Sequence, residues 1–336
     1  MTTSRQFVLA RRPQGRVRED DFSLVQTEIG PVPNGGIRLE TLVVSLDPAI
    51  RGWLDDRPSY LPPVAIGAPV RSFGLARVTE SRNPGYRPGD VVRGFVGWQE
   101  RQVVPEPDPT WERITPEPGI PLETALGVLG MPGLTAWVGV HDILRPEPGQ
   151  TMLISGASGA VGTLAVQLAK RAGARVLGIA GGTMKCALLT EQLGLDAAID
   201  RHDPDWCDHL TAATPEGIDL VFENSGGPMF DATIARLENH ARIALCGLID
   251  GYNQATRPAG PANFGLLLTK RVLTQGFIVL DHLHRAPEIG KQLAGLIRDQ
   301  EIQAIQTVEH GFDRLPVAFV GSFTGGHLGK LLVDLT

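Results

Sequence analysis

From about residue 126 to residue 296, short apolar runs alternate with longer segments whose apolar residues recur at helical spacing. Runs such as 151–155 and 175–180 have the length of buried strands, and segments such as 160–173 and 184–194 have the length and period of amphipathic helices. A strand followed by a helix and a second strand makes a parallel βαβ unit, and repeated units make a doubly wound sheet with helices on both faces. The sequence therefore predicts an α/β chain with a Rossmann-type domain in this region.

The residues before this region have a different character. Runs rich in β-branched residues, such as 37–46 and 89–104, are separated by clusters of proline and glycine such as 82–90. At 336 residues the chain is long for a single core, so each half is expected to bury a core of its own. We expect the first half to be a small β-barrel or sandwich, and we expect 326–335 to form a strand after a helix over 286–300.

The stretch LISGASGAVG places Gly156, Gly159 and Gly162 between the expected strand at 151–155 and a helix expected from about Ala160. In a βαβ unit this is where the first helix presents its N-terminus to an anion. The missing side chain at Gly159 would let the backbone approach a pyrophosphate, and at Gly162 it would let the helix lie close on the strand. The spacing departs from the G-x-G-x-x-G fingerprint, so a tight turn that holds no ligand is the alternative interpretation.

Residues in and after this turn indicate which dinucleotide would bind. Ser158 is interpreted as a hydrogen-bond donor to phosphate, because the G-x-S-x-G pattern of a serine nucleophile lacks its last glycine here. The next strand ends without the carboxylate that binds an adenine ribose 2′-hydroxyl, and Gly181 and Gly182 follow it. Lys185 and Arg201 stand at the ends of this strand and the next one, where they would attract a 2′-phosphate. The sequence therefore favours NADP(H), with ordinary solvated surface charges as the alternative.

Metal ligands are missing where a catalytic zinc would need them. Residues 1–140 contain no cysteine and no histidine, and the three cysteines, Cys186, Cys207 and Cys246, are scattered. A catalytic or structural zinc ion needs three or four clustered ligands. We therefore expect no metal site and no disulfide framework.

Composition excludes several other classes. The net charge of −6 gives no basic excess for a nucleic acid backbone, and a hydrophobic content of 42% is that of an ordinary globular protein. The N-terminal residues lack the apolar core and cleavage site of a signal peptide, and no uncharged apolar run is long enough to cross a membrane. We expect a cytoplasmic protein with no nucleic acid or membrane partner.

Several longer segments resemble one known family. They are LDPAIRG at 46–52, GVLGMPGLTAWVGV at 127–140, GASGAVG at 156–162, LGLDAAID at 193–200, FENSGG at 222–227, CGLIDGYN at 246–253, GFIV at 276–279 and HLGKLLV at 327–333. Together they resemble the zinc-free branch of the medium-chain dehydrogenase/reductase superfamily, and within it the NADP-dependent alkenal/one reductases, which include prostaglandin reductases and bacterial curcumin reductases. The resemblance covers nearly the whole chain. It implies a GroES-like β-barrel domain for substrate binding and catalysis at 1–125 with 297–336, a Rossmann NADP(H)-binding domain at 126–296, and a homodimer.

The resemblance also implies a set of cofactor contacts. The residues expected to meet the pyrophosphate are Ser158, Gly159, Ala160 and Val161, and the lysine expected to bind the 2′-phosphate is Lys185. The residues expected to line the nicotinamide half are Asn224, Cys246, Gly247, Leu248 and Tyr252. A backbone strip beside the carboxamide is expected at Phe277, Ile278 and Val279.

Three positions depart from the family's pattern. Arg201 stands where tyrosine is usual, although a guanidinium serves a phosphate at least as well as a phenol does. Ala49 stands where an aromatic residue is usual, so the mouth of the substrate pocket is expected to differ from the prostaglandin type. His327 stands where asparagine is usual, so this cofactor contact is expected to be changed.

These features predict an enzyme that reduces the carbon–carbon double bond of α,β-unsaturated ketones and aldehydes with NADPH and without zinc. Hydride from the reduced nicotinamide would reach the β-carbon while charge develops on the carbonyl oxygen. Tyr252 is the expected donor to that oxygen and a candidate proton source, with water, a ribose hydroxyl of the cofactor, or a mere packing role for Tyr252 as alternatives. The expected partner is a small enone or enal. A quinone oxidoreductase or enoyl-thioester reductase of the same superfamily, or a non-catalytic NADPH-binding protein, are the other interpretations that the sequence leaves open.

Overall fold

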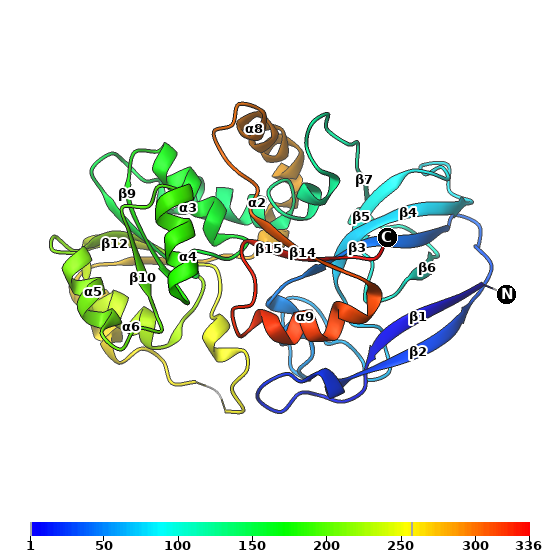
Figure 1. The fold of residues 1–336 in the computed structure, drawn as a ribbon, viewed down its shortest axis with the longest axis horizontal. Helices are drawn as coiled ribbons and strands as arrows, with labels where there is room; N and C mark the ends of the chain where they lie inside the picture. The colour runs from blue at the N-terminus through cyan, green and yellow to red at the C-terminus, as the bar shows by residue number, and fades with distance from the viewer. Residues whose placement is uncertain (1, 257) are drawn as a thin grey trace. The chain divides into compact units, whose positions relative to one another are not determined.

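The computed structural model describes residues 2–256 and 258–336. The chain divides into two compact units, of which one runs up to Leu126 and resumes at Gln306–Thr336 and the other spans Gly127–Ile305 (Figure 1). Among the described residues, no helix has both the length and the apolar character needed to cross a bilayer.

The unit Gly127–Ile305 is built on a six-stranded sheet. In spatial order its strands are β10 (Ala197–Asp200), β9 (Arg175–Ala180), β8 (Thr151–Ser155), β11 (Ile218–Glu223), β12 (Leu237–Leu245) and β13 (Leu273–Gly276). All neighbouring strands pair in parallel. From β8 the chain continues to β9 and β10 on one side of the sheet and then to β11, β12 and β13 on the other side. The sheet is therefore doubly wound, which confirms the Rossmann-type α/β fold predicted from the sequence.

Helices cover this sheet on both faces. They are α2 (Met131–Trp137), α3 (Gly162–Arg171), α4 (Thr183–Ala187), α5 (Trp206–Ala213), α6 (Gly227–Ala235), α7 (Gly265–Thr269) and α8 (Ala286–Arg298). In β8, Met152 and Ile154 belong to the same hydrophobic cluster as Leu164 of α3, whereas Leu153 belongs to another cluster with Phe230 of α6. Successive side chains of a strand point to opposite faces, so an apolar run without polar alternation needs a helical layer on each side.

Three expected helices differ in their details. The segment 122–130 contains a 3₁₀ turn at Leu122–Leu126 that ends before α2, whose start is set by a proline in its first turn. The helix expected over 160–173 begins at Gly162, after the glycine turn. The segment 184–194 is divided between α4 and a wider π-type turn at Leu188–Gln192.

The other unit contains a seven-stranded sheet and a separate two-stranded ribbon. The ribbon pairs β1 (Thr2–Leu9) with β2 (Phe22–Ile29). The sheet contains β3 (Ile37–Leu46), β4 (Phe73–Ser81), β5 (Val91–Phe95), β6 (Arg101–Val104), β7 (Glu112–Arg113), β14 (Gln306–His310) and β15 (Lys330–Asp334), with α1 (Ala49–Trp53) and α9 (Leu315–Ser322) as its main helices. The C-terminal strand β15 pairs with β3, with Leu331 opposite Leu46, so both ends of the chain belong to one unit. The indole of Trp98 is fully buried in its core, with its ring centroid 4.9 Å from that of Phe22.

The second boundary between the units lies at 305/306, whereas the sequence pattern placed it at 296/297. The residues after α8 stay with the parallel sheet because Ile302 is buried in the core beside α3. The side-chain amide of Gln167, on α3, also donates to the carbonyl of Gln303 at 3.1 Å and accepts from its backbone N–H at 2.6 Å. The roles of the two units in binding substrate and cofactor stay predictions.

Candidate active site

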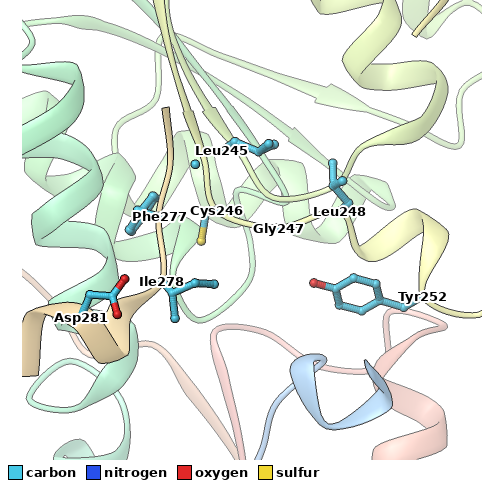
Figure 2. Close-up of a pocket in the computed structure, with 9 residues that line it drawn as sticks. Leu245, Cys246, Gly247, Leu248, Tyr252, Phe277, Ile278 and Asp281 are labelled. Carbon is cyan, nitrogen blue, oxygen red and sulfur yellow. The ribbon is translucent and has the colours of Figure 1, made fainter. Parts of the chain in front are cut away.

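A pocket of about 460 Å³ opens at the carboxyl ends of β12 and β13, which are neighbours in the parallel sheet. It is lined by Leu245, Cys246, Gly247, Leu248, Tyr252, Gly276, Phe277, Ile278 and Asp281 (Figure 2). Open α/β sheets bind their ligands just outside the carboxyl ends of the strands. The lining is largely apolar and carries few polar groups, which suits an organic ring better than a hydrated ion.

Tyr252 directs its ring into this pocket. Figure 2 shows its hydroxyl pointing toward Cys246 and Ile278 on the other side. Burial raises the pKa of Tyr252 above that of an ordinary phenol, and a backbone hydrogen bond from Leu248 opposes the increase. The side chain therefore remains a neutral hydroxyl, able to donate a hydrogen bond, at neutral and moderately alkaline pH.

The thiol of Cys246 is the second polar group on the pocket wall. Burial, together with the charge of Glu223, raises the pKa of the Cys246 thiol to about 12. Because the thiolate is the nucleophilic form, Cys246 is a poor nucleophile at neutral pH. It contributes a small, soft surface to the pocket.

The turn between β8 and α3 is shaped by its glycines. Gly156 has φ +59°, and a β-carbon on Gly162 would overlap the carbonyl oxygen of Gly156 and lie 2.7 Å from the Cα of Ala157. The first residue of α3 therefore lies against the turn that follows β8, whereas the close approach at Gly162 was expected to be to the strand itself. A β-carbon on Gly159 would meet only the Gly156 oxygen, at 3.3 Å, so the other side of Gly159 is open. The remaining residues expected to bind the pyrophosphate lie in the same turn, with Ser158 buried and Ala160 and Val161 half-buried.

Two cations lie together beyond β9 and β10. A β-carbon on Gly181 would lie 2.9 Å from Nε of Arg201, so the arginine side chain crosses the end of β9. Burial and the positive charge of Arg201 both lower the pKa of Lys185. Among the described residues neither cation lies within ion-pair distance of a carboxylate. The nearby carboxylate of Asp200 interacts with the charge of Arg201 and accepts hydrogen bonds from two backbone amides, at 2.7 and 2.9 Å. The arrangement leaves a positive site that an anion would neutralise.

A buried hydrogen-bond network at the ends of β8 and β11 was not predicted from the sequence. The hydroxyl of Ser155 donates to Oε1 of Glu223 at 2.7 Å, and the side-chain amide of Asn224 donates to the Ser155 carbonyl at 2.7 Å. The amide nitrogen of Asn224 thus anchors the chain to β8, and the expected contact of Asn224 with the nicotinamide half stays a prediction. The sequence feature that could have indicated this network is Glu223, a charged residue that directly follows the expected buried strand 218–222 and precedes a glycine-rich turn.

The backbone strip after β13 is only partly at the pocket. Phe277 and Ile278 line it, whereas Val279 does not; both Phe277 and Val279 pack against the hydrophobic core. Asp281 also lines the pocket and was not predicted. It follows the GFIV segment by two residues and is the one carboxylate among the lining residues.

Two further positions singled out in the sequence belong to the other unit. His327 lies in the loop between α9 and β15, and Ala49 is the first residue of α1. Their roles toward the cofactor and the substrate stay predictions.

No cluster of three or more His, Cys, Asp or Glu side chains that could hold a metal ion occurs in the part of the chain that the structure describes.

Comparison with known proteins gives two family matches. Residues 5–111 match a family described as the N-terminal domain of oxidoreductase, and residues 160–294 match one described as zinc-binding dehydrogenase. The second description mentions zinc, although residues 1–140 contain neither of the two residue types that zinc sites favour most, cysteine and histidine.

Individual relatives match over the whole chain. The chain is 38% identical to the NADPH-dependent curcumin reductase of Escherichia coli (strain K12), over 98% of this chain and 96% of that protein. It is 35% identical to the NADP⁺-dependent 2-alkenal reductase of Nicotiana tabacum, over 98% of this chain and 97% of that protein. The crystal structure of CurA from Vibrio vulnificus in complex with NADPH superimposes with a TM-score of 0.93 at 36% identity and covers 99% of both chains. The chain therefore belongs to the medium-chain dehydrogenase/reductase superfamily and, within it, to the NADP-dependent alkenal/one reductases.

Proposed function

We propose that this protein uses NADPH to reduce the carbon–carbon double bond of α,β-unsaturated ketones and aldehydes. The observation that carries the proposal is the Tyr252 hydroxyl, which points into a largely apolar pocket at the carboxyl ends of β12 and β13. The chain's similarity to curcumin and 2-alkenal reductases supports the same class of substrate.

The residues present fit NADPH on three grounds. The backbone of the turn is open to a ligand at Gly159, where a β-carbon would meet only the Gly156 oxygen, and the N-terminus of α3 follows directly. Lys185 and Arg201 form a positive site with no ion-pair partner among the described residues, so a 2′-phosphate would compensate their mutual repulsion. The carboxylate of Asp200 is already engaged by backbone amides. We infer that Ser158 and its neighbours in the turn hold the pyrophosphate, and that the pocket holds the nicotinamide ring.

The bound cofactor would supply hydride to the β-carbon of the substrate. As the double bond is reduced, negative charge develops on the carbonyl oxygen, and a hydrogen bond from Tyr252 stabilises that charge more strongly than it stabilises the neutral ketone. The phenol is neutral in this pocket, so it has a proton to donate. The side chains of Ile278 and Phe277 beside it are apolar, so they offer the carbonyl oxygen no competing hydrogen-bond donor.

The neutral state of Cys246 fits this substrate class. Enones and enals are electrophiles that alkylate thiolates, and a thiol with a pKa of about 12 is almost entirely protonated at neutral pH. A cysteine can therefore line the pocket without being consumed by the substrate.

We also propose a homodimer. The edge strand β13 has no neighbour on its outer side within the described sheet, and Leu273, Leu268 and Phe264 on or just before it are exposed. An unpaired edge flanked by large apolar side chains is a surface on which a second copy can pair. Light scattering after size-exclusion chromatography gives the mass of the particle and tests this directly.

The experiment that tests the function is a substrate panel followed by the loss of reduced-nicotinamide absorbance, with NADPH and NADH in parallel. We expect turnover with enones such as 3-nonen-2-one and a clear preference for NADPH. Turnover with benzoquinone alone would support the quinone oxidoreductase interpretation instead. Binding of NADPH without turnover on any enone or quinone would leave a cofactor-binding protein and would overturn the proposal.

A further inference from the structure

Glu223 is a carboxyl group that the proposed chemistry does not use, and it is fully buried at the end of β11. Its Oε1 accepts three hydrogen bonds, from the Ser155 hydroxyl and from the backbone amides of Ser225 and Gly226, each at 2.7 Å. Its Oε2 is buried and has no partner among the described residues. Burying a carboxyl group is unfavourable unless hydrogen bonds replace those it loses with water, and the three hydrogen bonds to Oε1 do so here.

Ser155 completes the cluster from the neighbouring strand. While its hydroxyl donates to Glu223, its oxygen accepts from the backbone amides of Asn224 at 2.8 Å and Ser225 at 3.1 Å. The two side chains therefore fix the path of residues 224–226 immediately beyond β11. Gly226 has φ +74° within this loop, a conformation that favours glycine and that the hydrogen bond to Glu223 holds.

The loop 224–226 in turn holds the segment that carries the pocket. The carbonyl of Asn224 accepts from the amide of Ile249 at 3.1 Å, and the carbonyl of Ser225 accepts from the amide of Asp250 at 2.8 Å. The carbonyl of Ile249 then accepts from the amide of Tyr252 at 3.1 Å. A continuous series of hydrogen bonds thus runs from the Glu223 carboxyl to the residue whose hydroxyl faces the pocket in Figure 2.

We propose that Glu223 and Ser155 are positioning residues that set the place of the Tyr252 hydroxyl through the loop 224–226. This inference rests on the proposed function, because it assigns the two residues an effect on the donor of that reaction. They do not touch the substrate. A displacement of the loop moves Tyr252, and a hydrogen bond that matters in the transition state is lost with a small change in distance.

The test is a double-mutant cycle measured on the full-length protein. Glu223→Asp shortens the side chain by one methylene and so withdraws the acceptor oxygen from the loop. Ser155→Ala removes the hydroxyl that connects Glu223 with residues 224 and 225, with little change in volume. Each change is made alone and in combination with Tyr252→Phe. With NADPH and 3-nonen-2-one, we expect each single change to lower kcat by about tenfold, with a smaller effect on KM. In the Tyr252→Phe background the same changes should lower kcat by less than about threefold, because the group that they position has already been removed.

Two controls separate positioning from loss of folded protein. Thr233→Val removes a buried hydroxyl whose hydrogen bond stays within α6, and it should leave kcat unchanged. Glu223→Gln keeps an acceptor oxygen at the original reach and should retain more of kcat than Glu223→Asp does. A structural role alone would lower kcat by the same factor in both backgrounds.

The outcomes distinguish the two levels of the proposal. Equal losses of kcat in both backgrounds, or unchanged kcat in both Glu223→Asp and Ser155→Ala, with the wild-type turnover intact, would overturn the positioning role alone. Absence of wild-type turnover with every enone would overturn the proposed function itself.

Discussion

The backbone of Gly162 lies against the carbonyl of Gly156, so closely that a β-carbon at position 162 would overlap the carbonyl oxygen. The first residue of α3 therefore packs directly on the turn that begins after β8. This contact sets where the N-terminus of α3 points, and with it the part of the chain that is expected to receive the pyrophosphate.

Gly162→Ala should lower the free energy of unfolding by about 1–3 kcal/mol, because the added methyl forces the turn and the helix apart. It should also weaken NADPH binding, since the displaced turn no longer presents the same cradle. Urea unfolding followed by circular dichroism and titration of NADPH fluorescence measure the two effects. The matched control is Gly295→Ala in α8, where a β-carbon meets no atom within 4 Å and the change should be neutral or stabilising by about 0.5–1 kcal/mol. Equal stability of the two variants would contradict the close packing at Gly162.

Arg201→Ala should weaken NADPH binding by about tenfold or more and leave NADH binding nearly unchanged, because the lost hydrogen bonds are to the 2′-phosphate alone. Lys185→Ala should act in the same direction. Binding is measured by fluorescence titration with each dinucleotide at fixed ionic strength, since part of the attraction is screened by salt. Lys291→Ala, at an exposed position of α8 outside the site, serves as the control of equal charge change. A parallel loss of NADPH and NADH affinity would refute the assignment of these cations to the 2′-phosphate.

The fold of the parallel-sheet unit and most of the expected cofactor contacts could be predicted from residues that are close together in the sequence. The alternation of strand and helix, the glycines of the turn, and the position of Lys185 and Arg201 after consecutive strands are all relationships between residues near one another in the chain or in repeated units. Parallel topology then brings the ends of those strands to one edge of the sheet, which is why Cys246 and Ile278 meet in one pocket.

Relationships between distant residues could not be predicted in the same way. Ser155 and Glu223 are separated by 68 positions, and nothing in either segment specifies that a serine hydroxyl will face a glutamate across β8 and β11. The chain segment after α8 gives a second example, because Gln303 is retained in the parallel-sheet unit by a glutamine on α3 that lies 136 positions away. Side chains that satisfy one another's hydrogen bonds in a core depend on packing that hydrophobic periodicity does not describe.

Cys246 should react slowly with N-ethylmaleimide despite its place on the pocket wall. With a pKa of about 12, its thiolate is a very small fraction at pH 8, and the rate should rise about tenfold per pH unit across the alkaline range. Cys207 is exposed and serves as the internal reference, to be modified first. Peptide mapping by mass spectrometry after timed quenching gives both rates. Labelling of Cys246 as fast as Cys207 at pH 8 would contradict its neutral state in the pocket.

The pH dependence of turnover should report the protonation of Tyr252. Burial raises its pKa, so the neutral hydroxyl persists as the pH rises past about 10, the ordinary value for a phenol, and kcat should fall only above that point. Tyr252→Phe should lower kcat by about tenfold or more and abolish this alkaline decrease, because the donor that titrates has been removed.

The control is Tyr86→Phe, which removes another phenol whose pKa is raised by burial but whose hydroxyl donates to the Trp111 carbonyl in the other unit. Its kcat and pH profile should match the wild type. An alkaline limb that survives in Tyr252→Phe would assign the titration to another group and remove Tyr252 from the chemistry.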